Sequence, residues 1–323
     1  MDLISEQTVV EARVSQSLEM MSRDGVGADE DTLIVALTYR CNSACTFCII
    51  ATEIGQRLQD TPESVVNEVL AFNAEHRRFR RLTFSGAEVT LRPDLARIAR
   101  RATTEGGFEV VRIQTNARRL RDPAMVRELM DAGVREFFVS LHAPTAKLDA
   151  AITRSSRSFD EAVAGVRQLV RAGATVLTNT VISAKNVDAL EETVRLIASL
   201  GVEHVQLWSF LEVADPTQKD DHVRLSESMP QVRAALDAAE ELGLTAVVKW
   251  LPRCLLGRHG AALDNHQPHM VIRDEFQNRL GENFGFGCVH GDCRWLGNGC
   301  AGIHETYRAR FGDEADLLRP ERA

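Results

Sequence analysis

The sequence contains no apolar run that approaches the roughly 20 residues needed to cross a bilayer, so we expect no membrane partner. Its first residues, Met1-Asp-Leu-Ile-Ser-Glu, lack the basic and apolar regions of a secretory signal. A net charge of −8 at pH 7 argues against a nucleic-acid backbone as the main partner. We therefore predict a cytoplasmic protein, in which thiols stay reduced and clustered cysteines indicate a metal or catalytic site.

The chain has only seven cysteines, and they fall into two groups. The first group is Cys41, Cys45 and Cys48, in a run that reads Leu33-Ile-Val-Ala-Leu-Thr-Tyr-Arg-Cys-Asn-Ser-Ala-Cys-Thr-Phe-Cys48. A tight loop of this kind can direct three thiolates to three corners of one iron–sulfur cube and leave the fourth iron without a protein ligand. Zinc prefers four tetrahedral ligands, often as two Cys-x-x-Cys pairs, and no second pair lies nearby. A zinc site and a disulfide with one spare thiol are the alternatives.

From residue 31 to about 210, short strand-like runs alternate with segments of helical periodicity. Predicted strands span residues 32–38, 81–85, 110–115, 136–141, 174–182 and 204–210, and predicted helices span 62–76, 92–105, 122–132, 159–172 and 187–200. We expect Thr61 to cap the first helix, and Gly133, Gly173 and Gly201 lie just past helix ends. This alternation predicts parallel βαβ units and an α/β fold. Six units fit a partial (β/α)6 TIM-like barrel, in which chemistry gathers at the carboxyl ends of the strands.

A second motif follows the second predicted strand, in Leu82-Thr-Phe-Ser-Gly-Ala-Glu-Val-Thr-Leu91. Its small residues allow a ligand to approach the backbone closely. With the cysteine loop, it resembles the signature of the radical S-adenosylmethionine (radical SAM) enzymes, over about residues 31–210. In that family the open iron chelates SAM, and one electron from the [4Fe–4S] cluster splits SAM into methionine and a 5′-deoxyadenosyl radical. The usual family motif is Gly-Gly-Glu-Pro, and this chain departs from it at Ala87 and Val89.

The resemblance implies which residues hold the cluster and SAM. Cys41, Cys45 and Cys48 would bind the cluster, and the SAM contacts would come from Phe47, Ser85, Gly86, Ala87, Glu88, Thr115, Asn116, Ser140, Arg154, Asn179 and Leu207. In this set Phe47 would pack near the adenine, the Leu207-Trp-Ser209 end of the sixth strand would flank it, and Arg154 would pair with a carboxylate. His142, at the end of the fourth predicted strand, is either a structural histidine or a proton carrier. A flavodoxin or ferredoxin would be the reductant.

The second thiol group is Cys254, Cys288, Cys293 and Cys300, in a segment over residues 252–303 with little periodicity. Four thiolates complete either a closed iron–sulfur cube or a Cys₄ zinc site. In a radical SAM context the segment resembles the auxiliary-cluster extensions named Twitch or SPASM, which implies a second [4Fe–4S] cluster. Alternatively, Cys254 returns a hydrogen atom to the substrate, as a lone thiol does in some radical SAM epimerases. The cluster would then keep an open site or take a histidine ligand from the set His259, His266, His269 and His290, which are otherwise loop histidines on a solvated surface.

We expect a lead-in over residues 1–30, a radical SAM barrel over 31–225 and an auxiliary-cluster extension over 226–323. Thirty residues are too few for the leader-binding domain of many peptide-modifying relatives, which favours a small polar metabolite over a peptide. An auxiliary cluster favours an oxidative outcome such as dehydrogenation, cross-linking or decarboxylation over epimerisation. Acidic residues after the sixth strand either line the substrate site or are solvated: Glu212, Asp215, Asp220 and Asp221. An iron–sulfur sensor or scaffold is the non-enzyme alternative, although it needs no SAM pocket.

Overall fold

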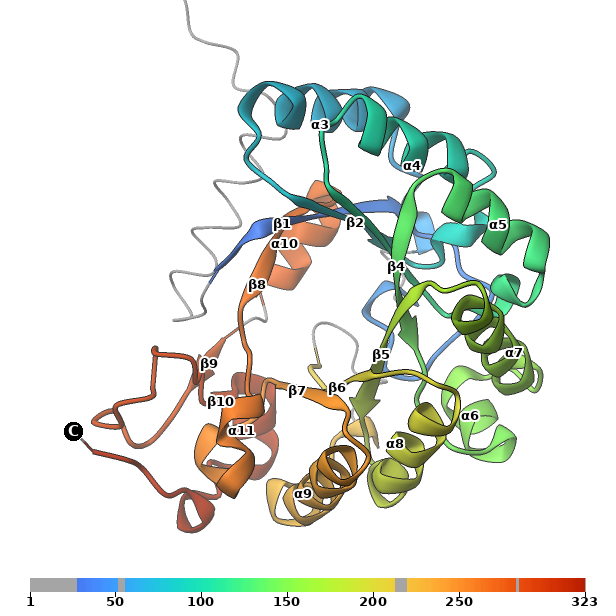
Figure 1. Cartoon of the computed structure of the whole chain (residues 1–323). Helices are drawn as coiled ribbons and strands as arrows, with labels where there is room; N and C mark the ends of the chain where they lie inside the picture. The colour runs from blue at the N-terminus through green and yellow to red at the C-terminus, as the bar shows by residue number, and fades with distance from the viewer. Residues whose placement is uncertain (1–27, 52–55, 213–219, 283–284, 323) are drawn as a thin grey trace, which may run out of the picture.

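The computed structural model describes residues 28–51, 56–212, 220–282 and 285–322. Eight parallel strands form one sheet in the order β7-β6-β5-β4-β3-β2-β1-β8, and this sheet curls into an open barrel with helices outside it (Figure 1). The strands are β1 (Ala28–Thr38), β2 (Arg81–Gly86), β3 (Val110–Thr115), β4 (Val134–Ser140), β5 (Thr175–Ile182), β6 (His204–Ser209), β7 (Thr245–Lys249) and β8 (Gln267–Val271). The α/β partial-barrel fold is therefore confirmed.

The core lies between the sheet and its helices. These helices are α3 (Glu63–His76), α4 (Leu95–Thr104), α5 (Pro123–Asp131), α6 (Ala146–Thr153), α7 (Ser158–Arg171), α8 (Leu190–Ser199) and α9 (Leu225–Glu241). Leu33, Val35 and Leu37 of β1 are buried in one cluster with helix residues such as Val66 and Ile98. Because side chains alternate across a strand, the residues between them face the interior of the barrel. The same alternation assigns an inner and an outer face to each neighbouring strand.

All six predicted strands and the five predicted helices are present, with ends that differ by a few residues. Gly133, Gly173 and Gly201 have φ values of 99°, 74° and 80°, as expected for glycines that follow helices. The predicted cap at Thr61 is wrong, because Thr61 Oγ1 donates to the carbonyl of Ala36 at 2.5 Å. That contact links the segment before α3 to strand β1 instead.

The sheet continues beyond the six strands that the periodicity indicates. β7 lies beyond the last predicted strand, and β8 lies in the segment over residues 252–303 with little periodicity. The predicted boundary at residue 225 therefore falls inside the sheet, between β6 and β7. Of the predicted lead-in, residues 1–27 lie outside the described residues.

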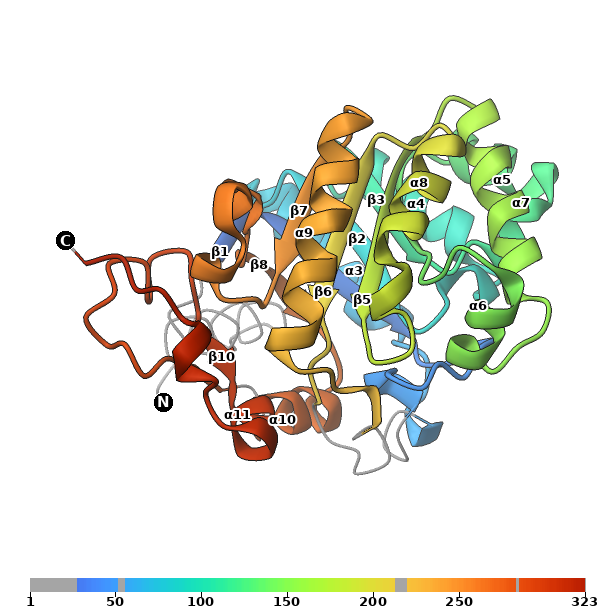
Figure 2. The same ribbon diagram turned by 90° about the horizontal axis from the view of Figure 1, so that it is seen from below.

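After β8 come α10 (Asp274–Glu282), a two-stranded antiparallel pair of β9 (Phe286–Gly287) with β10 (Ile303–His304), and α11 (Glu305–Phe311). Figure 2 shows α10 and α11 at the same end of the barrel as the loop that follows β1. The carboxyl end of the barrel thus brings together segments from both halves of the chain. Within the described part of the chain, no helix is both long and apolar enough to cross a membrane.

Candidate active site

The first cysteine group lies in the loop after β1, at the carboxyl edge of the sheet. The last turn of α6 anchors this loop: the N–H groups of Ala44 and Thr46 donate to the carbonyls of Thr153 at 3.1 Å and Ile152 at 2.9 Å. Carbonyls in the last turn of a helix have no partner within the helix, so these contacts satisfy them. The cysteine loop is therefore fixed by backbone hydrogen bonds without any ligand.

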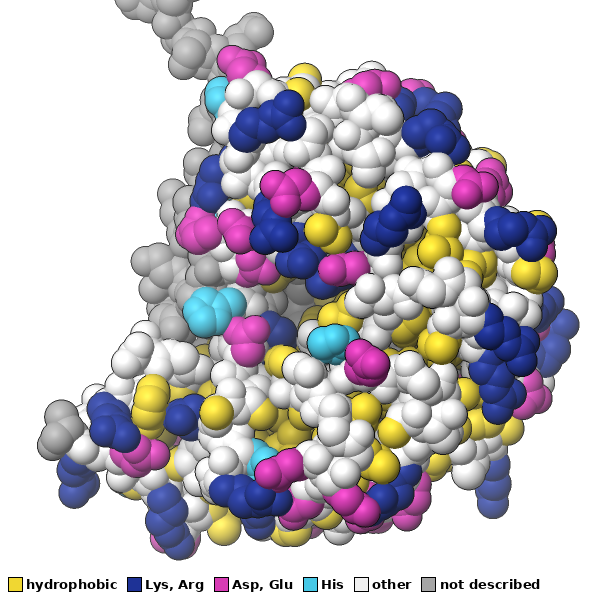
Figure 3. Space-filling model, viewed as in Figure 1, with side chains coloured by type: hydrophobic (Ala, Val, Ile, Leu, Met, Phe, Trp, Pro, Cys, Tyr) yellow, Lys and Arg dark blue, Asp and Glu magenta, His cyan; other side chains and the backbone are white. Residues whose placement is uncertain are grey.

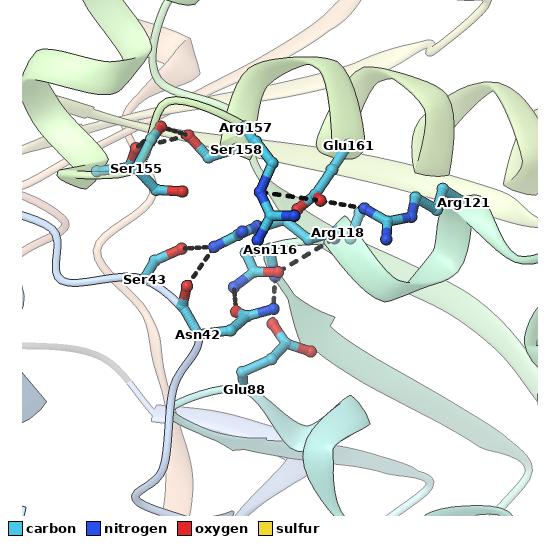
Figure 4. A network of polar contacts seen from close by, with 12 residues as sticks. Asn42, Ser43, Glu88, Asn116, Arg118, Arg121, Ser155, Arg157, Ser158 and Glu161 are labelled. Atoms are coloured by element: carbon cyan, nitrogen blue, oxygen red, sulfur yellow. Dashed lines mark hydrogen bonds and ion pairs between the residues drawn. The ribbon is translucent and has the colours of Figure 1, made fainter.

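Arg118 holds the same loop from the other side (Figure 4). Its Nη1 atom donates to the carbonyl of Asn42 and, at 2.9 Å, to Ser43 Oγ. Its Nε atom pairs with Glu161 at 2.7 Å, and Glu161 also pairs with Arg121. The Arg118 side chain is only 7% exposed, so this ion pair is shielded from water. Sequence reasoning missed Arg118, because no motif separates it from the other arginines nearby.

The thiols of this loop fit a positively charged ligand. Burial raises the pKa of the Cys41 thiol to about 11. Burial raises the pKa of Cys45 further, and the neighbouring thiols of Cys48 and Cys41 add to the effect. A thiolate is the form that binds metal, so a cation or an iron–sulfur cluster would offset the cost of ionising these groups. The donor set of three thiols in one preformed loop is the set that a cluster with one open iron requires.

The predicted glycine motif packs against the end of β1. Gly86 has a φ of +116°, and a Cβ atom at this position would lie 2.2 Å from the carbonyl oxygen of Thr38. The N–H groups of Ala87 and Glu88 donate to the carbonyls of Thr38 at 2.8 Å and Arg40 at 3.0 Å. Only glycine fits this close approach at position 86.

Glu88 is fully buried, and neighbouring protein groups occupy both of its carboxylate oxygens. Oε1 accepts from Thr115 Oγ1 at 2.7 Å and from the Thr90 N–H at 3.1 Å, and Oε2 accepts from the Asn116 N–H at 2.7 Å. This carboxylate therefore joins the end of β2 to the end of β3. The side-chain contacts with SAM that the resemblance implies for Glu88 and Thr115 gain no support from this geometry.

Polar side chains form a row on the inner face of the barrel. Ser140, Asn179 and Gln206 are paired across β4, β5 and β6. Asn179 is 4% exposed, and its Nδ2 atom has no hydrogen-bond partner among the described residues. A buried amide without a partner is costly, so Asn179 Nδ2 is a donor that a bound ligand would satisfy. Ser140 and Asn179 thus lie on the inner face of the sheet, and their contacts with SAM stay predictions.

Leu207 does not face this interior. Its side chain is fully buried in the core between sheet and helices, whereas Gln206 and Trp208 lie on the opposite face of β6. Trp208 contacts Phe138 of β4, with ring centroids 5.8 Å apart. Strand alternation thus removes the Leu207 side chain from the residues that could flank adenine, whereas the rest of the predicted strand end stays a candidate. Trp208 is the residue at this strand end whose side chain faces the interior.

Two other predicted contacts have different surroundings. Phe47 packs edge-on against His142, with ring centroids 4.7 Å apart. Arg154 is exposed and follows α6 with a left-handed φ of 54°. Phe47 is half-buried within the cysteine loop. The guanidinium of Arg154 has no defined partner among the described residues of the site.

His142 is held as a neutral imidazole. Its Nδ1 atom accepts from the Val181 N–H at 3.2 Å, which leaves the proton on Nε2. Burial lowers the pKa of His142 to about 4. Of the two alternatives, the structural role is therefore favoured over the proton carrier.

The acidic residues after β6 differ in how deeply they are buried. Asp221 is 2% exposed and accepts from Lys185 Nζ and, at 3.1 Å, from Thr46 Oγ1 in the cysteine loop. Glu212 pairs with His222 at 3.0 Å, and Asp220 is exposed. Asp215 lies outside the described residues. Asp221 is thus an internal support of the cysteine loop, which corrects the expectation of a substrate-facing or solvated carboxylate.

The second thiol group converges on one pocket near the C-terminus. The pocket lining includes Cys254, Cys288, Cys293 and Cys300, together with Arg253, His290 and Trp295. The N–H groups of Arg253 and His290 point at sulfurs, 3.5 Å from Cys300 Sγ and 3.4 Å from Cys288 Sγ. Burial raises the pKa of both Cys254 and Cys300. The four thiols therefore surround one pocket, and a bound cation would stabilise their ionised form.

The four histidines considered as cluster ligands in place of Cys254 have different surroundings. His259 contacts Asp237 and His266 contacts Asp264, each at 2.7 Å. His269 is fully buried beside Phe79, with ring centroids 5.3 Å apart. Of the four histidines, His290 is the one that lines the cysteine pocket.

Comparison with known proteins decides the family. The model of the radical SAM superfamily matches residues 35–197. The chain belongs to the radical SAM superfamily. This family implies a [4Fe–4S] cluster and SAM as cofactors, so the family recognised from the sequence is confirmed.

Curated relatives of this radical SAM chain include probable GTP 3′,8-cyclases. The protein from Methanopyrus kandleri is 31% identical over 197 residues, which are 57% of this chain and 58% of the relative. The protein from Saccharolobus solfataricus is 29% identical over 185 residues, with 57% and 58% coverage. The chain thus spans less than two thirds of the length of these relatives.

Solved structures share the fold. SuiB of Streptococcus suis bound to S-adenosylmethionine has a TM-score of 0.57 at 16% identity, covering 72% of this radical SAM chain and 53% of SuiB. Methylornithine synthase (PylB) has a TM-score of 0.56 at 15% identity, covering 84% of this chain and 81% of PylB. At such low identity the likeness shows the fold alone.

Proposed function

We propose that this chain binds a [4Fe–4S] cluster at Cys41, Cys45 and Cys48 and binds SAM beside it, at the carboxyl ends of the strands. The observation that carries the proposal is the convergence at this edge of the cysteine loop, the Gly86 turn against Thr38 and the unpartnered amide of Asn179. When bound, the cluster and SAM supply a carbon-centred radical that takes hydrogen from a substrate carbon. The protein's own part is to orient both groups and to exclude water.

The substrate in this proposal is a small polar metabolite. Near the cysteine loop the inner face of the sheet is polar, since Ser140, Asn179 and Gln206 lie side by side on β4, β5 and β6. The space-filling view shows the opposite end of the barrel, at the amino ends of the strands, where acidic and basic side chains surround a central hollow (Figure 3). A polar interior suits a hydroxyl-rich or charged substrate better than an apolar one. The relatives named for GTP are consistent with a small substrate.

We place an auxiliary [4Fe–4S] cluster in the pocket of Cys254, Cys288, Cys293 and Cys300, which makes the C-terminal segment a Twitch-like extension. Two backbone N–H groups directed at sulfurs and the raised pKa values of two thiols support this assignment over unrelated surface cysteines. A Cys₄ zinc site is the competing occupant. An oxidative reaction needs an electron acceptor, and this pocket is where we locate it. The enzyme would then be an oxidoreductase that receives its electron from a cytoplasmic flavodoxin or ferredoxin.

A peptide is the second candidate substrate, because SuiB, which shares the fold, was solved with its precursor peptide. The two candidates are separated by turnover assays with metabolite pools and with peptides. A sensor or scaffold without turnover needs no SAM pocket. It therefore gives no reason for the buried Asn179 amide to lack a hydrogen-bond partner among the described residues.

Electron paramagnetic resonance (EPR) spectroscopy of the anaerobic, reduced protein tests the cluster assignment. Addition of SAM should change the spectrum of wild type, because SAM binds the open iron. Cys45→Ala should lose the SAM-dependent change and keep any auxiliary signal, whereas Cys300→Ala should keep the change. A wild type with a full cluster content whose spectrum ignores SAM would contradict the proposal.

A further inference from the structure

Asn116 directs its side-chain amide at the cysteine loop (Figure 4). Its Nδ2 atom donates to Asn42 Oδ1 at 2.7 Å and lies 3.8 Å from Cys41 Sγ, within the range of a hydrogen bond to sulfur. The N–H of Ser43 reaches the same sulfur at 3.3 Å. Cys41 is therefore the target of two N–H groups, one of which belongs to a side chain that can be replaced.

The orientation of this amide is set by its neighbours. The Arg118 N–H donates to Asn116 Oδ1 at 3.1 Å, which fixes the oxygen end because an amide nitrogen cannot accept. The Asn116 N–H donates to Glu88 Oε2 at 2.7 Å and holds the backbone. The two hydrogens of Nδ2 are thereby left to face Asn42 and Cys41. Asn116 is thus bonded through its backbone and both ends of its amide.

We propose that Asn116 tunes the reduction potential of the SAM-site cluster through a hydrogen bond to the Cys41 sulfur. The inference rests on the proposed ligation of that cluster by Cys41. A donor to a ligating thiolate draws charge from the sulfur, and this stabilises the more negative, reduced cluster more than the oxidised one. Asn116 would therefore raise the potential and make the cluster easier to reduce. Its role is to position a donor, in place of the contact with SAM that the resemblance implies.

Redox titration of the full chain, followed by EPR, measures this effect directly. Asn116→Ala should lower the midpoint potential of the SAM-site cluster and leave the auxiliary cluster unchanged. We expect the equilibrium constant for one-electron reduction to fall about threefold to tenfold, where tenfold corresponds to about 59 mV. An unchanged midpoint in a variant with full iron content would overturn the inference.

Arg118→Lys is the matched control. This substitution weakens the side-chain hydrogen bonds to Asn42 and Ser43 of the loop. It keeps the backbone N–H of residue 118, which orients the Asn116 amide. We expect its midpoint to stay at the wild-type value, and a shift as large as that of Asn116→Ala would show that loop rigidity, not the hydrogen bond, sets the potential.

Asn116→Asp covers the case in which the alanine variant does not retain its cluster. Aspartate keeps the shape and the oxygen that accepts from Arg118 but removes the donor, so its midpoint should also lie below wild type. A wild type without any SAM-dependent signal would instead contradict the proposed function. A normal signal with unchanged midpoints in both Asn116 variants would overturn the tuning role alone.

Discussion

Gly86 lies so close to Thr38 that a Cβ atom on Gly86 would be 2.2 Å from the Thr38 carbonyl oxygen. The turn after β2 and the base of the cysteine loop therefore share one backbone contact, which ties the glycine motif to the candidate cluster. Real Cβ atoms do not approach an oxygen this closely, so a larger residue must displace one of the two segments.

Gly86→Ala should lower both SAM affinity and stability. The displaced turn carries the segment expected to hold the amino group of SAM, and a non-glycine residue at this positive φ costs roughly 1–3 kcal/mol. Isothermal titration with SAM and thermal unfolding would measure the two effects. Gly173→Ala is the control, because Gly173 also has a positive φ (+74°) but nothing lies within 4 Å of the place that its Cβ atom would take. It should lose stability and keep SAM affinity; equal loss of SAM affinity in both variants would contradict the account.

Asn179→Val should weaken SAM binding without destabilising the fold. The Asn179 Nδ2 atom is buried without a partner among the described residues, so its removal relieves a cost in the free protein. If SAM accepts a hydrogen bond from it, the dissociation constant should rise about tenfold, the equivalent of about 1.4 kcal/mol. A variant that binds SAM normally but unfolds more easily would assign Asn179 to structure alone.

Because of His142, we expect the free energy of unfolding to fall as the pH becomes acidic. Its folded pKa of about 4 lies below the ordinary value of 6.5, so below pH 6.5 the unfolded chain takes up a proton that the folded chain does not. Stability from this group is therefore complete above pH 6.5 and falls as the pH drops towards 4. Between pH 7.5 and 5.5 the loss should be about 1 kcal/mol.

The variant His142→Asn tests whether His142 causes this pH dependence. The asparagine oxygen can replace Nδ1 as the acceptor for the Val181 N–H. Chemical unfolding of both proteins at the two pH values would show a smaller pH dependence in the variant. The same pH dependence in both proteins would place the effect on other groups.

Cys254→Ala distinguishes a cluster ligand from a hydrogen-atom donor. If all four C-terminal cysteines bind the auxiliary cluster, Cys254→Ala and Cys300→Ala should both lose it, and iron should fall from about eight towards about four per chain. If Cys254 donates hydrogen, Cys254→Ala should keep its iron while Cys300→Ala loses it. Iron analysis with Mössbauer spectroscopy measures the difference, and iron-free, zinc-loaded wild type would contradict the auxiliary cluster altogether.

Much of the barrel is predictable from sequence, because its six central strands are apolar and alternate with periodic helices. β8 is not predictable in this way. Its residues Gln267–Val271 include Pro268, which is tolerated because β8 is an edge strand beside β1. α6 is also missing from the sequence prediction, although its last carbonyls anchor the cysteine loop. Short elements stabilised by tertiary contacts carry little local signal.

The candidate site likewise has residues that the sequence reveals and contacts that it does not. The cysteines and Gly86 are recognisable, because their chemistry or backbone geometry admits few substitutes. Strand ends alone do not reveal that Glu88 and Thr115 bond to each other, or that Asn116 reaches Cys41. Those contacts depend on the register and the loop path, and Leu207 shows the error that results when the face of a strand is assigned by resemblance.

The most direct test of the account is the quantity of 5′-deoxyadenosine formed by the anaerobically reconstituted protein with SAM and a strong reductant. Wild type should form it, and Cys45→Ala should form none above the level without protein. Chromatography with mass detection would quantify the product. A wild type that holds its full iron content and binds SAM, yet forms no more 5′-deoxyadenosine than Cys45→Ala, would contradict radical SAM chemistry at this cysteine loop.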